Sequence, residues 1–283
     1  MSFKHLLWLR ISLILIVACL TSIGVAPNVS ASGPIVWSAD VETGDLSQWR
    51  IDNNFSSVEV DTGLCFRPPN GVSTEQAHSG QYSMKLTIYS INMDSGCRQF
   101  RKPEPVSGET YYYSAWFYIP QYVEVGTFWN IFQFMAAPEG EPARVYWKLD
   151  VRDMPDKRLR IVPIWKGPEP GPHAGDGLDA VQYYQNLTTV PVGEWFHLEA
   201  YLKQSGAYDG QIIVWQDGIE ILNEQNVKTK QADGFQTWSV NNYGNDVIPA
   251  PNSIYIDDAV ISTIRIGSIY HSYMPIVLKN APS

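Results

Sequence analysis

Short runs in which apolar and polar residues alternate dominate the sequence after Ser32. Such runs, separated by turn residues, are typical of β-strands. They lie at residues 82–89, 111–120, 128–136, 143–152, 159–165, 195–203, 211–218 and 253–262. No long stretch has the period of an amphipathic helix. The pattern predicts an all-β protein, a β-sandwich or jelly roll of two stacked antiparallel sheets.

One of these runs, FWNIFQFMA at residues 128–136, carries an amide, Gln133, in an apolar setting. Strict alternation puts Trp129 and Gln133 on one face and Asn130 on the other, and both faces are apolar enough for a strand covered on both sides. A buried amide costs about 1–3 kcal/mol unless it finds partners. Gln133 therefore either bonds to neighbouring backbone or faces a ligand cleft.

The N-terminus predicts export. Basic residues precede the apolar run 11–20, and Val29 to Ala31 supply a small-residue cleavage site, so residues 1–31 are expected to be a signal peptide. The alternative is a lipid anchor at Cys19. No later run approaches the roughly 18 apolar residues of a membrane span, so a secreted protein is expected.

The rest of the chain divides into a jelly-roll domain at residues 32–268 and a tail at residues 269–283. The tail either resembles the short apolar C-terminal ends of some secreted bacterial proteins or forms a last strand. Removal of the signal leaves Cys65 and Cys97, and an even pair in an exported chain predicts one disulfide. The net charge of −9 argues against nucleic acid as a partner.

The run 143–152 has one strongly polar face. It carries Arg144, Tyr146, Lys148, Asp150 and Arg152. Such a face is either a solvated sheet surface with ion pairs or the floor of a sugar-binding groove. In a groove, aromatic rings cover pyranose faces and cations bind hydroxyls or carboxylates. Trp129 is a further candidate ring for this groove.

A second polar face, in the run 195–203, contains His197 and Glu199. The histidine is either structural or catalytic. Glu199 and Asp150 could supply in space the paired carboxylates that a glycosidase needs, although sequence spacing cannot show such a pair. No nucleophile triad signature, phosphate loop or zinc motif is present.

Four segments carry a resemblance to a known family. They are WSADVETGDLSQW (37–49), AHSGQYSMKL (77–86), GEWFHLEAYLKQSGAYDGQIIVWQDG (193–218) and IYIDDAVIS (254–262). Together they resemble concanavalin A-like jelly-roll proteins, specifically the heparin lyase I-like and related glucuronan and alginate lyases. The similarity spans nearly the whole mature chain. Carbohydrate-binding modules share these sequence segments as well.

The resemblance implies β-elimination on a uronic-acid polymer, which requires neutralising the carboxylate, removing the C5 proton and protonating the departing oxygen. Arg98 and Gln133 match the residues that would bind the carboxylate. Tyr243 matches the tyrosine that acts as base, acid or both, and a tyrosine base needs positive charge nearby, which Arg98 could supply.

This sequence departs from the family motifs at three positions. The histidine of the Gln-x-His strand is Met135, and the lysine and glycine before the tyrosine are Ser239 and Asn241. A lyase without that histidine relies on Tyr243 alone or on another residue such as His197.

A structural Ca²⁺ is also expected. Alternation in the run 253–262 sends Asp258 inward, where a carboxylate needs a partner, and Asp40 and Glu42 lie in the first segment. Jelly rolls that resemble this one often join first and last strands through calcium held by carboxylate and backbone oxygens. The alternative is a capped or hydrogen-bonded Asp258.

Three functions remain open at this point: a secreted polysaccharide lyase, a non-catalytic carbohydrate-binding jelly roll, and a structural or adhesive surface protein. A monomer that binds a uronic-acid-containing polysaccharide is expected. A pocket that unites Arg98, Gln133 and Tyr243 would favour the lyase, and an open aromatic platform without that cluster would favour binding.

Overall fold

The structure, a computed structural model, describes residues 34–49, 71–89, 91, 95–101, 110–137, 144–167, 171–177, 179–231 and 235–267. The predicted signal peptide, Cys19 and the predicted tail at 269–283 lie outside these residues. Cys97 is buried in a strand, but Cys65 also falls outside, so the disulfide stays a prediction. Within the described chain, no helix has both the length and the apolar character needed to cross a membrane.

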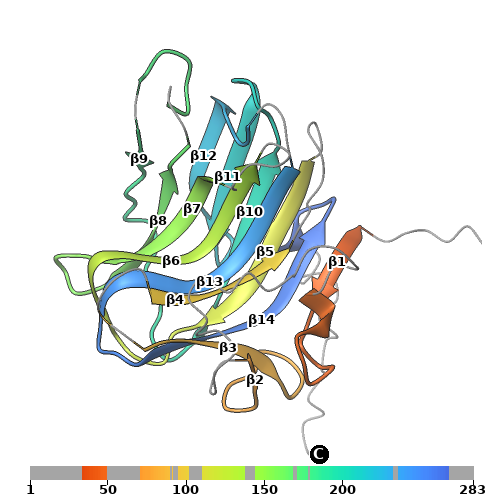
Figure 1. The fold of residues 1–283 in the computed structure, drawn as a ribbon, viewed down its shortest axis with the longest axis vertical. Coiled ribbons are helices and arrows are strands. Elements are labelled where there is room, and N and C mark those ends of the chain that lie inside the picture. The colour runs from red at the N-terminus through yellow and green to blue at the C-terminus, as the bar shows by residue number, and fades with distance from the viewer. Residues whose placement is uncertain are drawn as a thin grey trace, which may run out of the picture. The chain divides into compact units, whose positions relative to one another are not determined.

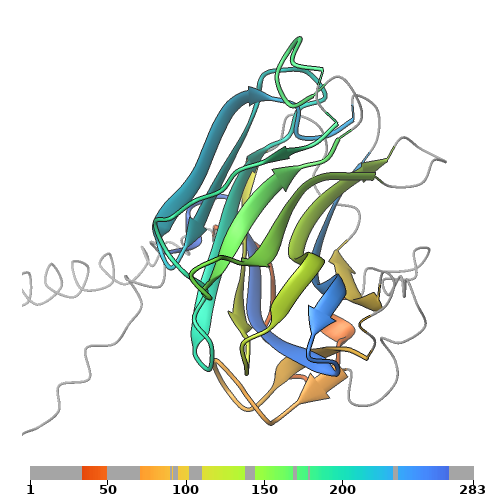
Figure 2. The same cartoon turned by 90° about the vertical axis from the view of Figure 1, so that its left-hand side faces the viewer.

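Two antiparallel sheets form the domain (Figure 1). The first sheet contains, in spatial order, β12 (Ile219–Val227), β11 (Gly210–Gln216), β10 (Trp195–Lys203), β5 (Thr110–Tyr118), β14 (Asn252–Ser262), β3 (Ser83–Ile88) and β2 (Gly71–Ser73), with β1 (Ile35–Ala39) also paired to β14. The second contains β4 (Ser95–Arg101), β13 (Phe235–Ile248), β6 (Glu124–Ala137), β7 (Arg144–Asp153), β8 (Leu159–Trp165) and β9 (Val181–Gln182). Figure 2 shows the layers from the side. The predicted all-β sandwich is confirmed.

Alternation in the strands explains how the sheets face each other. In β5 and β10, Phe117 and Phe196 are opposite each other and fully buried, whereas their chain neighbours Trp116 and His197 lie on the outer face. Each buried aromatic side chain contributes about 1.5–3 kcal/mol through removal from water. The inward set of one sheet therefore packs on the inward set of the other.

Tryptophans fill one end of the core. Trp238 of β13 has its ring centre 5.8 Å from that of Trp49, which lies in the short 3-10 helix η1 (Ser47–Trp49). Its ring centre is also 5.4 Å from Phe132 of β6 and 5.5 Å from Tyr113 of β5. The cluster joins η1 to both sheets, so the segment after β1 is anchored by packing.

A buried amide links the two sheets through hydrogen bonds. The Nδ2 atom of Asn242 in β13 donates to the carbonyl oxygens of Leu86 in β3, at 2.9 Å, and of Asn252 in β14, at 3.0 Å. Its Oδ1 atom accepts the indole N–H of Trp129 in β6 at 2.7 Å. Asn242 is fully buried, so one side chain is a hydrogen-bond partner for three groups in the core.

Replacing Asn242 with alanine should therefore destabilise the fold strongly. Each buried group that loses its partner costs about 1–3 kcal/mol, so we expect a loss of about 3 kcal/mol or more in the free energy of unfolding. Urea denaturation measures it. Asn223→Ala, in the exposed part of β12, is the control and should change stability by less than about 0.5 kcal/mol. An equally small change in Asn242→Ala would contradict the role of this amide.

Candidate active site

A groove of about 560 Å³ lies on the outer face of the six-stranded sheet. All six strands or the segments next to them contribute to it. Its lining residues are Arg98, Thr127, Phe128, Asn130, Gln133, Val145, Lys148, Arg152, Ile164, Lys166, Ala180, Gln182, Tyr243 and Asn245. The groove thus unites Arg98, Gln133 and Tyr243, which were predicted to act together, with Lys148 and Arg152 from the predicted basic face.

A β-bulge aims the central residues into the groove. Val240 of β13 is opposite Phe132 of β6, but Tyr243 is opposite Asn130, so two residues of β13 face one residue of β6. A bulge shifts the alternation by one position and redirects the side chains that follow. β6 has its own irregularity against β7, because Asn130 is opposite Asp150 and Phe132 is opposite Leu149, which leaves Ile131 as an extra residue. Asn130 and Gln133 line the same groove, and the prediction from strict alternation that they lie on opposite faces is wrong.

Cations and rings form a continuous strip along the groove. The guanidinium carbon of Arg98 lies 4.4 Å from the ring centre of Tyr243. The ring of Phe128 lies 5.4 Å from that of Tyr243, and Lys148 Nζ lies 4.9 Å from the ring centre of Phe128. Such cation–π contacts hold the charged groups beside the tyrosine.

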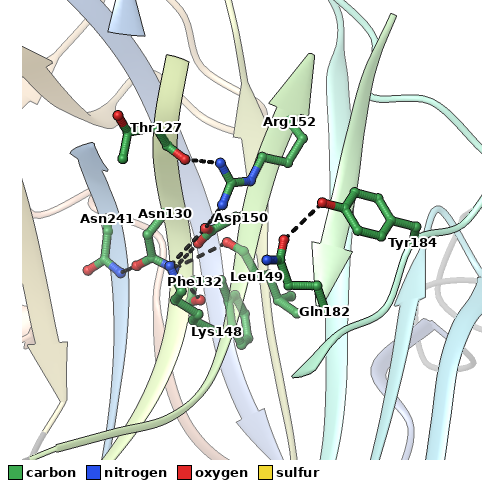
Figure 3. Close-up of polar contacts among 10 residues, drawn as sticks. All are labelled: Thr127, Asn130, Phe132, Lys148, Leu149, Asp150, Arg152, Gln182, Tyr184 and Asn241. Atoms are coloured by element: carbon green, nitrogen blue, oxygen red, sulfur yellow. Dashed lines mark hydrogen bonds and ion pairs between the residues drawn. The ribbon is translucent and has the colours of Figure 1, made fainter. Parts of the chain in front are cut away.

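A buried carboxylate, Asp150, supports the positive side of the groove (Figure 3). Its Oδ2 atom accepts from Lys148 Nζ at 2.8 Å and from Arg152 Nη2 at 3.2 Å, and Arg152 also donates to the carbonyl oxygen of Thr127. Asn130 Nδ2 lies 3.4 Å from the other carboxylate oxygen. Burial lowers the pKa of Lys148, and the charge of Asp150 opposes that shift.

Gln133 itself is almost fully buried at the floor of the groove. Its Nε2 atom donates to the sulfur of Met135 at 3.2 Å, and thioether sulfur is a weak acceptor. Across the sheet it is paired with Ser239 on one side and Lys148 on the other. An oxygen acceptor placed in the groove would be a stronger partner for this amide than the sulfur is.

The sequence pattern of the family described as "Polysaccharide lyase" matches residues 41–259. This match covers well over half of the chain. The chain belongs to the polysaccharide lyase family. The family expected from the sequence is thereby confirmed, and no curated protein matches.

Several solved structures share the fold. The endo-β-1,4-glucuronan lyase of the fungus Trichoderma reesei is similar with a TM-score of 0.59 and 18% identity, covering 81% of this chain and 96% of its own. The marine alginate lyase of Aplysia kurodai follows with a TM-score of 0.50 and 13% identity, over 81% and 99% of the two chains. An alginate lyase from a Chlorella virus has a TM-score of 0.50 and 10% identity, over 68% and 89%. At these identities the likeness concerns the fold.

Three predicted substrate-binding residues lie away from the groove. Trp129 is fully buried and belongs to the core, so its assignment to the groove is corrected. Tyr146 is also in the core, because a register shift between β6 and β7 leaves it as an extra residue between Val145 and Trp147. Arg144 is exposed at the start of β7 and is absent from the lining.

His197 lies in the other sheet, on the outer face of β10, and cannot share the groove with Tyr243. Its ring centre is 5.0 Å from that of Trp116, within a half-buried aromatic surface. That surface includes Tyr112, Trp116, Tyr118, Trp195 and Tyr201. The suggestion that His197 replaces the family histidine is therefore wrong.

The carboxylate pair considered for a glycosidase is also excluded by the fold. Glu199 lies in β10 of the eight-stranded sheet, where its carboxylate accepts the backbone N–H groups of Ile266 and Gly267. Asp150 lies in the six-stranded sheet and is held by cations. The two carboxylates belong to different sheets and cannot flank one glycosidic bond.

The expected calcium ligands bind protein groups instead. Asp258 accepts from Ser79 Oγ at 2.8 Å and lies 2.6 Å from His78 Nδ1, while Glu42 accepts the N–H groups of Gln81 and Tyr82. Asp40 accepts from Gln48. No three acidic, histidine or cysteine residues gather as a metal site in the described part of the chain. Calcium binding is not tested by this arrangement and stays a prediction that metal analysis checks.

The inward orientation predicted for Asp258 needs correction as well. The register between β14 and β5 shifts between Asp257 and Val260, and Asp258 adopts a positive φ of 45°. Asp257 is consequently the buried carboxylate, and Asp258 is hydrogen-bonded near the surface. This arrangement corresponds to the hydrogen-bonded alternative.

The sequence did not single out several groove residues. Phe128 and Asn130 belong to the same apolar run as Gln133. Asn130 is a polar residue within that run, as Gln133 is, and this feature could have identified it as a groove residue. Lys166 and Gln182 reach the groove from a loop and from a two-residue strand. No local pattern marks positions of that kind.

The pH dependence of stability should reveal the burial of His197. Burial lowers its pKa to about 4 in the folded protein from an ordinary value near 6.5, so the folded state binds fewer protons than the unfolded state between these values. The contribution of His197 to the free energy of unfolding should therefore fall by up to about 3 kcal/mol as the pH falls from 6.5 to 4. Urea denaturation at several pH values measures this slope, which should flatten in His197→Phe. An unchanged slope in that variant would contradict the assignment.

Proposed function

We propose that the protein is a secreted lyase that cleaves a uronic-acid-containing polysaccharide by β-elimination in the groove of the six-stranded sheet. The observation that carries this proposal is the meeting of Arg98, Gln133 and Tyr243 in one groove. Membership of the polysaccharide lyase family supports it. The similar glucuronan and alginate lyases suggest the class of polymer to be tested first.

The first task is to bind and neutralise the carboxylate of the sugar that reacts. Arg98 supplies a full positive charge and Gln133 an amide N–H that currently contacts sulfur. Hydrogen bonds from charged donors to a carboxylate are short and strong. They also stabilise the negative charge that develops on this group when the C5 proton leaves.

The second task is proton transfer. Tyr243 removes the proton at C5, the C5–H electrons form a C4=C5 double bond, and the bond from C4 to the glycosidic oxygen breaks. The Arg98 guanidinium, 4.4 Å from the ring centre, favours the phenolate that this step needs. The departing oxygen takes a proton either from Tyr243, which then gives back the one it removed, or from the Lys148 ammonium group beside Phe128, in which case solvent exchange resets both groups.

Tyr243→Phe removes only the hydroxyl group, so it should lower turnover at least about a hundredfold while leaving the fold and most of the glycan affinity intact. The measurement is the ultraviolet absorbance of unsaturated ends during incubation with glucuronan, alginate and other uronic-acid polymers. Tyr208→Phe, in the turn between β10 and β11, is the matched control and should keep wild-type turnover. Full activity of Tyr243→Phe would remove this residue from the mechanism.

Binding should depend on salt, although the protein as a whole carries a net charge of −9. Arg98, Lys148, Arg152 and Lys166 line the groove and Asp150 lies beneath it, so positive charge is concentrated where a polyanion would lie. Screening at high ionic strength weakens such attraction. KM for a uronic-acid polymer should rise several-fold between about 0.05 and 0.5 M salt, with kcat much less affected. A salt-independent KM would argue against an acidic substrate.

A non-catalytic carbohydrate-binding function is the second candidate, because the outer face of the eight-stranded sheet carries the half-buried aromatic surface around Trp116 and Trp195. Rings on a flat face can cover sugar rings. Glycan binding without product from any uronic-acid polymer would favour this candidate.

Export is part of the main proposal, and N-terminal sequencing of protein from the culture medium tests cleavage after Ala31.

A further inference from the structure

An exposed aromatic ring stands at the end of the groove. Tyr184 is 65% exposed, and its hydroxyl donates to Oε1 of Gln182 at 3.0 Å. Gln182 is itself part of the groove lining. Figure 3 shows the Tyr184 ring on the far side of Gln182 from Asn130. The hydroxyl end of Tyr184 therefore lies directly beside a lining residue of the groove.

The backbone that carries this ring is fixed on both sides. The N–H of Tyr183 donates to the carbonyl oxygen of Pro163 at 2.9 Å, and the Tyr183 ring stacks on Trp147 at 5.8 Å between ring centres. On the other side, the buried Gln185 side chain donates to the carbonyl oxygen of Ile161 and accepts the N–H of Leu187 at 2.8 Å. Tyr184 thus presents a large, solvated ring from a rigid segment.

Such a ring is well suited to bind a sugar. Binding costs less free energy when the interacting group is already held in place, because little conformational freedom is lost. Tyrosine offers a flat apolar face together with a polar end, and its hydroxyl is already oriented by Gln182. The remaining N–H donors of the Gln182 amide can bond to sugar hydroxyls.

We propose that Tyr184 and Gln182 form an outer sugar-binding subsite, in which the tyrosine ring covers the apolar face of a pyranose of the bound polysaccharide. The position of this subsite relative to the reacting bond rests on the proposed function. Four strand spacings separate β13, which carries Tyr243, from β9, or about 19 Å at ~4.8 Å each. The sugar at Tyr184 lies several units from the one that reacts.

Chain length therefore provides the test. Tyr184→Ala should lower kcat/KM for a long uronic-acid polymer by about threefold to tenfold, the usual effect of losing one aromatic contact. For an oligosaccharide too short to reach from Tyr243 to Tyr184, kcat/KM should not change. Tyr184→Phe, which keeps the ring, should retain most of the wild-type value on the polymer.

Leu187→Ala is the matched control, because Leu187 is also 65% exposed and lies in the same segment. It should leave kcat/KM unchanged for both substrates. An unchanged value for Tyr184→Ala on the polymer, or an equal loss on the short oligosaccharide, would overturn the subsite.

Affinity electrophoresis in gels containing the polymer separates this proposal from the proposed reaction. If the wild-type protein binds polymer but forms no unsaturated product, the lyase function fails, and the comparison of Tyr184→Ala with Leu187→Ala still decides the subsite. Weaker retardation of Tyr184→Ala alone supports the subsite, and equal retardation of the two variants overturns it. Failure of the wild-type protein to bind any uronic-acid polymer would overturn both proposals.

Discussion

The amide of Asn242 is the interaction on which the arrangement of the groove depends. It is buried between the sheets and bonds β13 to β3, β14 and β6 at once. Asn242 is also one of the two residues in the bulge of β13, directly before Tyr243. Because the amide has three partners in the core, the bulge can take one orientation, and Tyr243 consequently points to the outside of the sheet. A contact between the layers thus determines which way the candidate base points.

The groove gathers cations within an acidic protein, and Asp150 makes this possible. Without a nearby negative charge, Lys148 and Arg152 would repel each other in a partly desolvated place. One fully buried carboxylate oxygen accepts from both, so the two cations can stand side by side at the groove. The Asp150 carboxylate lies beneath the groove surface, whereas Lys148 and Arg152 line that surface. A bound polyanion would therefore contact mainly positive charge.

The sequence was sufficient for the fold because strands with one apolar face are visible as alternation. Residues 159–165 and 195–203 were predicted with their observed bounds. β13 was missed because its buried positions include Ser239, Asn241 and Asn242, which read as a polar loop. Arg98, Gln133 and Tyr243 were found through family motifs. Near the register shifts, strict alternation predicted the wrong sheet face for Asn130, Tyr146 and Asp258. Trp129 is apolar and buried, and its prediction as a groove residue was wrong as well.

The groove runs across the strands of its sheet, with Arg98 on β4 at one end and Gln182 on β9 at the other. Neighbouring units of a polymer lying in it would rest on different strands. A mutation in one strand then alters the contact with one unit and leaves the others in place. Tyr184 is a clear case, since its neighbours in the chain stabilise the fold and its own ring does not. Preference for polymer length and composition can therefore diverge among relatives by single substitutions, without loss of stability.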